Sequence, residues 1–368
     1  MSAPTLARED RSQEYAAFRA TCAQLVADVA GRGTPAFLRA AGEQGLLGVA
    51  LAEEHGGGGD PDARFPALLI ASAAAAGETG LALRLVLHAG VVGPLLDGLP
   101  GRSSTVAGVA SGATAVALAG LDVGTDRPAL QRVRGGWRLE GAVPSVVGAA
   151  DAELIAVVAQ DPDGCDAVLL VPAAVASLGA VDDPLAVPGA GMADIAFHGA
   201  SVSDADVLGG ADLVPRLRAD ADLWHAVVAV AAGRAALAQT LAYVAGRTVF
   251  GSPIGAFDNT HQALAAVDVR LRLAESLLDA GLAARTLAPL APAAAAALVL
   301  GALDASTLAA DTGLQLHGGY GYMHDYPIAQ AFADAAALRR LAAPGTHRQG
   351  LVAAALGLAP VRSRRLNA

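Results

Sequence analysis

Two stretches in the last third of the chain decide its fold. Residues 315–327 read QLHGGYGYMHDYP and residues 247–254 read RTVFGSPI. They border three long runs rich in Ala and Leu, 223–243, 260–287 and 292–316, which contain few turn signals. Runs of this length predict helices of about 30 to 40 Å at 1.5 Å per residue. The C-terminal part is therefore expected to be a helical bundle with a glycine- and tyrosine-rich loop.

The rest of the chain divides by the period of its apolar residues. Residues 11–99 are predicted to be helical, because apolar side chains recur with helical spacing, as at Phe18, Cys22 and Leu25. Between 104 and 210 the apolar runs are short and bounded by Gly, Asp and Pro, which predicts a small all-β domain. The fold class is therefore α+β, mostly α. Its predicted parts are an N-terminal helical domain (1–103), a central β domain (104–210) and a C-terminal helical bundle (211–368).

Composition excludes several functions. The 368 residues carry a net charge of −10, which argues against a nucleic-acid partner. All 25 basic residues are arginines, so the chain has no lysine for a P-loop, a Schiff base or a general base. Cys22 and Cys165 lie far apart, outside any metal-binding pattern, and are expected to be buried free thiols. No metal site is predicted.

The sequence also bears on location. The polar N-terminus lacks the apolar core of a signal peptide. The longest apolar stretch, 226–245, carries Arg234 and Gln239 near its middle, so no membrane span is expected. A cytoplasmic protein is predicted.

The motifs resemble those of one flavoprotein family. The two opening segments look like the C-terminal signatures of acyl-CoA dehydrogenases, residues 38–57 resemble the N-terminal pattern of that family, and residues 117–126 resemble its middle-domain flavin motif. The resemblance implies an N-terminal helical domain, a central β-barrel and a C-terminal four-helix bundle. It also implies FAD held at a subunit interface, an acyl-CoA substrate, and chemistry that removes an α-proton with a glutamate and passes a hydride to the flavin.

The customary glutamate is missing from both positions where the family places it. The residue before the Gly345–Thr346 pair is Pro344, which supplies neither a carboxylate nor a backbone N–H. The alternative position falls on Ala221, and the chain has no Glu between Glu153 and Glu275 or after it. The neighbouring Asp222 is a weak substitute, with a shorter side chain offset by one residue. No catalytic residue is therefore assigned.

The cofactor positions implied by the resemblance divide into two groups. Those that would contact the flavin ring within the chain are replaced by Ala119, Ser145 and Val147, and only Thr125 is kept. Those that would reach the pyrophosphate and adenosine of a neighbour's FAD are retained, although Asp258 stands where the family has Gln. The retained residues are Arg247, Phe250, Gln315, Gly318 and Gly319. Arginine suits a pyrophosphate because its planar fork binds it bidentately.

Simpler interpretations remain open for several of these residues. Arg247 could be a surface ion-pair partner, Gly318 and Gly319 a helix-terminal turn, and the tyrosines of 320–326 core packing. His261 and His317 are expected to be packed or helix-end residues rather than bases. The glycine run in 53–60, EEHGGGGD, is expected to be a flexible turn, with a ligand-wrapping loop as the alternative.

Three functions follow from this pattern. The favoured one is the non-catalytic subunit of a heteromeric acyl-CoA dehydrogenase, of the α2β2 heterotetramer kind found among bacterial enzymes for bulky substrates such as steroid side chains. This subunit would complete the FAD site of a related partner subunit. The second is an active homo-oligomeric flavoenzyme with a relocated base, for instance Asp222, or with monooxygenase chemistry. The third is a flavin-free scaffold or acyl-thioester binding protein.

Overall fold

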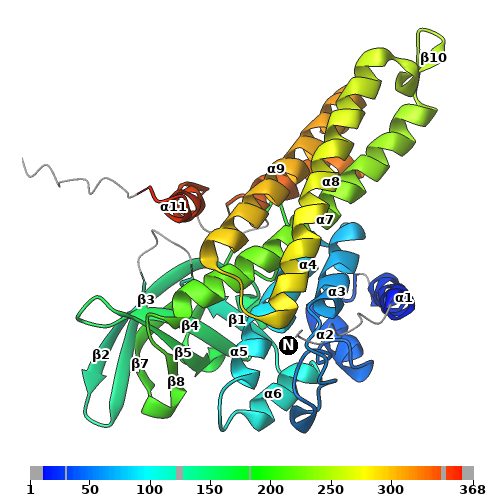
Figure 1. Cartoon of the computed structure of the whole chain (residues 1–368). Helices are drawn as coiled ribbons and strands as arrows, with labels where there is room; N and C mark the ends of the chain where they lie inside the picture. Colours follow the sequence, from blue (N-terminus) through cyan, green and yellow to red (C-terminus); the bar gives the residue numbers. More distant parts are fainter. Residues whose placement is uncertain (1–10, 30, 122–126, 182–183, 341–344, 359–368) are drawn as a thin grey trace, which may run out of the picture.

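A helical block, a sheet and an elongated helical bundle follow one another along the chain (Figure 1). The computed structural model describes residues 11–29, 31–121, 127–181, 184–340 and 345–358. The predicted fold class is confirmed. The predicted boundary at 103/104 lies at the start of a helix, Ser103–Ala110, and the first strand begins at Val116.

The N-terminal block consists of short helices around an apolar core. Its first helix buries the predicted stripe through Cys22, Leu25 and Val26, and it stops at Val29 before two glycines with positive φ, Gly31 and Gly33. A π-helical turn, η2 (Val86–Val92), joins two of the helices. The helices are α1 (Ser12–Val29), α2 (Thr34–Glu43), α3 (Arg64–Ala75), α4 (Thr79–Leu85), α5 (Gly93–Asp97) and α6 (Ser103–Ala110).

Within the described residues, eight strands form one mixed sheet in the order β6-β7-β3-β2-β4-β5-β8, with β1 added in parallel to β4. The central strands β4 and β5 are almost continuously apolar because they are buried along most of their length. The strands are β1 (Val116–Ala119), β2 (Ala129–Val133), β3 (Gly136–Val146), β4 (Leu154–Gln160), β5 (Asp166–Pro172), β6 (Ser177–Ala180), β7 (Ala193–Val202) and β8 (Val207–Gly209).

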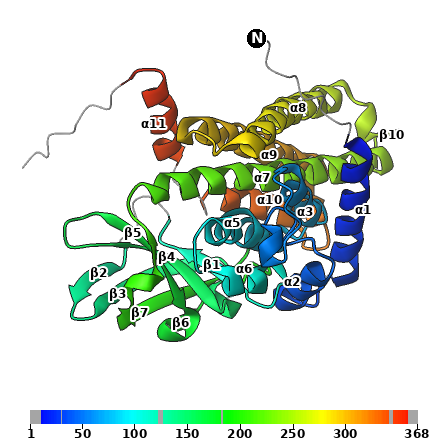
Figure 2. The ribbon, with the colours of Figure 1, turned by 60° about the horizontal axis from the view of Figure 1, so that its bottom comes forward.

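The C-terminal bundle is built on one long helix, α7 (Leu213–Gly246), which packs chiefly against α9 (Pro292–His317). Figure 2 shows α7 running the length of the molecule, with the sheet below one end and the β10 hairpin at the other. Proline at the first turn and Gly318 at the last mark the ends of α9. The remaining elements are β9 (Thr248–Val249), β10 (Ser252–Pro253), α8 (Asp258–Leu287), α10 (Pro327–Leu338) and α11 (Gly345–Ala355).

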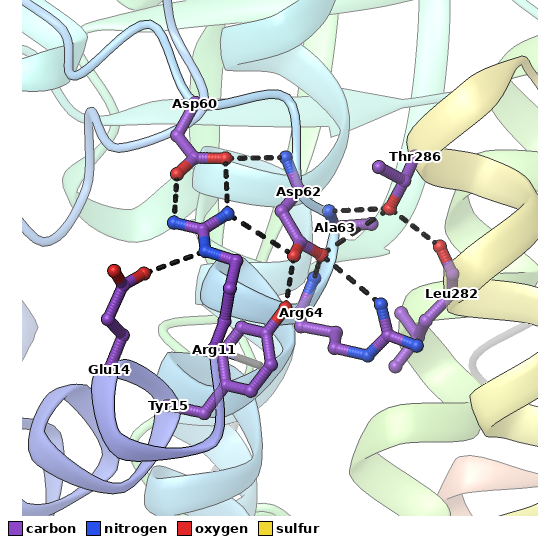
Figure 3. A network of polar contacts seen from close by, with 9 residues as sticks. All are labelled: Arg11, Glu14, Tyr15, Asp60, Asp62, Ala63, Arg64, Leu282 and Thr286. Atoms are coloured by element: carbon purple, nitrogen blue, oxygen red, sulfur yellow. Dashed lines mark hydrogen bonds and ion pairs between the residues drawn. The ribbon is translucent and has the colours of Figure 1, made fainter. Parts of the chain in front are cut away.

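A polar network joins the N-terminal block to the bundle (Figure 3). The Arg11 guanidinium donates to Asp60 and Glu14, and the Tyr15 hydroxyl donates to Asp62 at 2.5 Å. Thr286 near the end of α8 donates to Asp62 and accepts from the backbone N–H of Ala63. These bonds fix the turn before α3 between α1 and α8.

The structure corrects two expectations. Cys165 is exposed in the turn between β4 and β5, whereas Cys22 is buried, and burial raises the pKa of its thiol to about 12. The glycine run is not a flexible turn, because added Cβ atoms at Gly57 and Gly58 would overlap the backbone of residues 48–51. His55 further ties this turn to Asp97 through a 2.6 Å contact at Nδ1.

Among the residues that the structure describes, three helical stretches are long and apolar enough to cross a membrane by length and composition: Thr79–Asp97, Leu213–Gly246 and Pro292–Tyr322. Their apolar windows are 83%, 50% and 56% buried within the protein, which accounts for much of their apolar character. Arg234, in the second stretch, forms ion pairs with Asp268 and Glu275 of α8.

Candidate functional site

A cavity lies between the sheet and the N-terminal half of α7. We call it the sheet cavity. Ala119, Ser145 and Val147 line it from the sheet, and Ala221 and Asp222 line it from α7. Leucines of the helical block complete its apolar wall, namely Leu83 and Leu87. The positions that the family resemblance assigns to a flavin ring and a base therefore meet in one place.

The sheet side of this cavity offers few groups that would hold a flavin ring. The side chains of Ala119 and Val147 are apolar. Ser145 has a φ of 52°, next to a register shift between β3 and β7, and its N–H donates to Asp194 at 2.7 Å. Thr125, the retained hydroxyl residue, lies outside the described residues. The described sheet residues therefore do not fit a flavin ring held by side-chain hydrogen bonds.

The helix side of the cavity holds a buried ion pair. Nε and Nη2 of Arg348, at the start of α11, donate to the same oxygen of Asp222 at 3.0 and 2.5 Å. Arg348 is 1% exposed and Asp222 is 3% exposed. A carboxylate in this arrangement would give up the ion pair if it accepted a substrate proton. The geometry therefore disfavours Asp222 as a relocated base.

The histidines near this pair are poor proton acceptors at neutral pH. Burial and, to a lesser extent, the positive charge of Arg348 lower the pKa of His225 to about 4. Burial, followed by the charge of Arg218, also lowers the pKa of His347. Arg218 itself donates through Nε and Nη2 to the carbonyl of Leu121. Among the described residues, the cavity wall thus contains one guanidinium group, that of Arg218, and no carboxylate other than the paired Asp222.

Arg348 was not identified from the sequence. The signal that could have found it is Asp222, a carboxylate within the apolar run of α7, which needs a buried cationic partner. The partner lies 126 residues away in sequence, so only the tertiary placement of α11, which packs against α9, shows which arginine it is. Pro344 lies outside the described residues.

The retained cofactor residues gather at the opposite end of α7. Here a second cavity of about 430 Å³ is lined by Arg247, Gly318 and Gly319, with Tyr243 and Tyr320 beside them. Phe250 in the neighbouring hairpin is 96% exposed and Gln315 is exposed. We call the five retained residues the terminal surface.

Arg247 is exposed on this surface. Its guanidinium lies 5.3 Å from the centre of the Tyr320 ring, and within the described chain no carboxylate pairs with it. The alternative of a surface ion pair is therefore not supported. Arg247 remains available for an anion such as a pyrophosphate, which its fork can bind bidentately.

Two other residues of the surface adopt positive φ. Gly318 ends α9 with φ 57° and ψ −134°, and a Cβ at Gly318 or Gly319 would meet no neighbouring atom. The pair is thus both a helix terminus and an open surface. Phe250 has a φ of 52°, which is strained for an aromatic residue. Backbone strain of this kind, at a residue whose side chain is exposed, is common at sites that clamp a ligand.

The other side chains of this end behave differently from one another. Tyr320 and Tyr322 are 43% and 92% exposed, so the expectation of core packing is wrong for both. His317 is buried, stacks on Tyr243 with ring centres 3.9 Å apart, and contacts the carbonyl of Gly313, as expected for a packed residue. Asp258 lies in the first turn of α8, where the helix dipole favours a carboxylate.

The two sites cannot share one dinucleotide within a single chain. Arg218 lies near the start of α7 and Arg247 directly follows its last residue, and the 29 residues between them correspond to about 44 Å of helix. The fold and these sites define a three-part protein in which the positions that the family resemblance assigns to a cofactor lie at a sheet-facing cavity and at a distant exposed surface.

Comparisons with known proteins identify the family. Residues 10–98 match the model for "Acyl-CoA dehydrogenase, N-terminal domain" and residues 223–348 match "Acyl-CoA dehydrogenase, C-terminal domain". The chain belongs to the acyl-CoA dehydrogenase family, whose members bind FAD.

Relatives are distant but similar along most of the chain. The probable acyl-CoA dehydrogenase YngJ of Bacillus subtilis is 27% identical over 313 residues, covering 80% of this chain and 82% of its own. An acyl-CoA dehydrogenase structure from Geobacillus kaustophilus superposes with a TM-score of 0.85 at 20% identity, covering 97% of this chain and 100% of its own. A chain of the ChsE4-ChsE5 complex from Mycobacterium tuberculosis gives 0.83 at 21% identity, covering 96% and 99%.

Proposed function

We propose that this chain is the non-catalytic subunit of a heteromeric acyl-CoA dehydrogenase and that its terminal surface completes the FAD site of a related partner subunit. The observation that carries the proposal is the contrast along α7. The sheet cavity is lined mainly by apolar side chains, and its one carboxylate, Asp222, is paired with Arg348. At the other end of α7, Arg247 is exposed and unpaired within the described residues.

The chemistry expected of the complex is α,β-desaturation of an acyl-CoA thioester. FAD, when bound, supplies the hydride acceptor. Removal of the α-proton requires a carboxylate beside the α-carbon, and Ala221 and the paired Asp222 do not provide one. The base, the ring contacts and the acyl pocket are therefore assigned to the partner, and this chain is assigned the electrostatic binding of the cofactor's pyrophosphate through Arg247.

The proposal extends to assembly. The similarity to a chain of the ChsE4-ChsE5 complex supports a heteromeric arrangement. We expect an α2β2 heterotetramer in the cytoplasm. Bulky acyl-CoA thioesters, including steroid side chains, are the substrate class to test first.

The test is the flavin content of the chain with and without a partner. The chain expressed alone should purify without visible flavin absorbance. Co-expressed with a family member that retains the glutamate and ring contacts, it should form a complex with one FAD per heterodimer. Stoichiometric FAD on the isolated chain would contradict the proposal and favour an active homo-oligomer. A complex or isolated chain that never binds FAD would favour a scaffold.

A further inference from the structure

A third cavity lies at the junction of the N-terminal block and the loops of the sheet region, on another face of α4 from the sheet cavity. We call it the junction cavity. It has a volume of about 410 Å³, which is within the size range of small-molecule sites. Val26 and Val29 of α1, Phe37 of α2 and Leu81 of α4 form its apolar wall, and each of them is at most 8% exposed.

The opposite wall is a loop of the sheet region, residues 187–191, that contacts both the N-terminal block and the C-terminal bundle. The N–H of Val187 donates to the buried Asp334 of α10 at 2.7 Å, and Val187 has a strained φ of 50°. A Cβ at Gly80 of α4 would overlap the backbone of this loop, so the two segments touch directly. Thr34 of α2 donates to the carbonyl of Gly189 at 3.4 Å. These contacts hold the loop against α2, α4 and α10, so the shape of the cavity does not depend on a ligand.

The charges of the side chains that line the cavity do not sum to zero: there is one arginine and there are two carboxylates. Arg84, which is 4% exposed, forms an ion pair with Oδ1 of Asp151. Glu78 is the other charged residue in the wall. It precedes α4, is half-buried, and makes no side-chain capping bond or ion pair with the residues that the structure describes. One negative charge therefore remains beside an apolar space.

We propose that the junction cavity binds a small organic cation, a primary ammonium group attached to an apolar body. The ammonium would donate to the Glu78 carboxylate, and the body would lie against Phe37 and Leu81. Anionic ligands are disfavoured because two carboxylates face the cavity and the one guanidinium is already paired. This site is separate from both FAD-related regions, so it does not depend on the proposed subunit role.

Titration calorimetry of the full chain tests the site, with 2-phenylethylammonium chloride as the probe. Two molecules of similar shape, neutral 2-phenylethanol and anionic 3-phenylpropionate, serve as controls. The ammonium should bind one-to-one, and the alcohol at least about tenfold more weakly because it lacks the charge-assisted hydrogen bond. The carboxylate should not bind.

Variants locate the binding. Glu78→Gln keeps the shape of the side chain and should weaken ammonium binding at least about tenfold. Glu140→Gln removes an exposed carboxylate on β3 and should leave binding unchanged. Circular dichroism spectra would establish that both variants fold. The proposal is overturned if the ammonium gives no saturable heat, if the alcohol binds equally well, or if Glu78→Gln binds the ammonium like the unmodified chain.

Discussion

The sheet cavity and the terminal surface occupy opposite ends of α7, and they differ in how their charged groups are used. At the sheet cavity the Asp222 carboxylate and the Arg348 guanidinium are buried and form an ion pair with each other. At the terminal surface Arg247 and Phe250 are exposed, and Phe250 keeps a strained backbone with little packing to justify it. Charged groups at one end of α7 are therefore paired within the chain, whereas the arginine at the other end is exposed and free to meet the ligand that we propose for it.

The largest expected effect comes from breaking the ion pair of the sheet cavity. Arg348→Ala should lower the free energy of unfolding by about 3 to 5 kcal/mol, because it leaves the Asp222 carboxylate buried without a partner. Urea denaturation of the isolated chain measures the loss. The double variant Asp222→Leu with Arg348→Met should recover much of it. A loss below about 1 kcal/mol in the single variant would show that the pair does not anchor α11.

The terminal surface should give the opposite pattern with Arg247→Ala. Stability of the isolated chain should be unchanged, because the side chain is exposed. The complex should lose about 1.5 to 3 kcal/mol of FAD affinity, or roughly ten- to a hundredfold. Arg247→Lys should restore only part of this, since a point charge lacks the planar fork.

Calorimetric titration of the apo-complex with FAD measures the affinity. Arg270→Ala, which removes an exposed arginine of α8, is the matched control and should bind FAD normally. If Arg247→Ala had the same FAD dissociation constant as the control, Arg247 would have no role in holding the cofactor.

The buried histidine of the sheet cavity should make the chain sensitive to acid. The pKa of His225 is lowered to about 4 by burial and then by Arg348, whereas an unfolded histidine titrates near about 6.5. The unfolded chain therefore binds more protons between these values, and stability should fall as the pH decreases through this window, by up to about 1.4 kcal/mol per pH unit.

Urea denaturation between pH 4 and 7 tests this slope. His225→Gln should reduce it, and His261→Gln, an exposed histidine of α8, should not. An identical slope in all three proteins would place the acid sensitivity elsewhere.

The smallest expected effect on stability is that of Phe250→Gly at the terminal surface. Phe250→Gly should change the stability of the isolated chain by no more than about 1 kcal/mol, because relief of the positive φ offsets the greater freedom of glycine when unfolded. The same change should weaken assembly with the partner, since an aromatic contact is removed. Sedimentation velocity of this chain mixed with the partner measures assembly. Val133→Gly, an exposed site on β2, serves as the control.

The class of the fold was predictable from the sequence, and so was which of the family's cofactor positions keep their residue type and which do not. Helical spacing in α1 and α9 and the short apolar strands follow from local patterns, so their order was predictable. The replacement of the customary glutamate by Pro344 and Ala221 also needs no structure to see. Residues such as Arg247 and Gly318 could be singled out because they stand in motifs that resemble the C-terminal signatures of the family.

Only the tertiary structure decided how the remaining groups are used. The pairing of Asp222 with Arg348 joins residues 126 positions apart, and no local pattern encodes that contact. The exposure of Cys165 and Tyr322 and the close packing of the glycine run also depend on which surfaces meet. A sequence states which side chains are available, but whether a charge is buried and paired or exposed and free is set by the elements that pack around it.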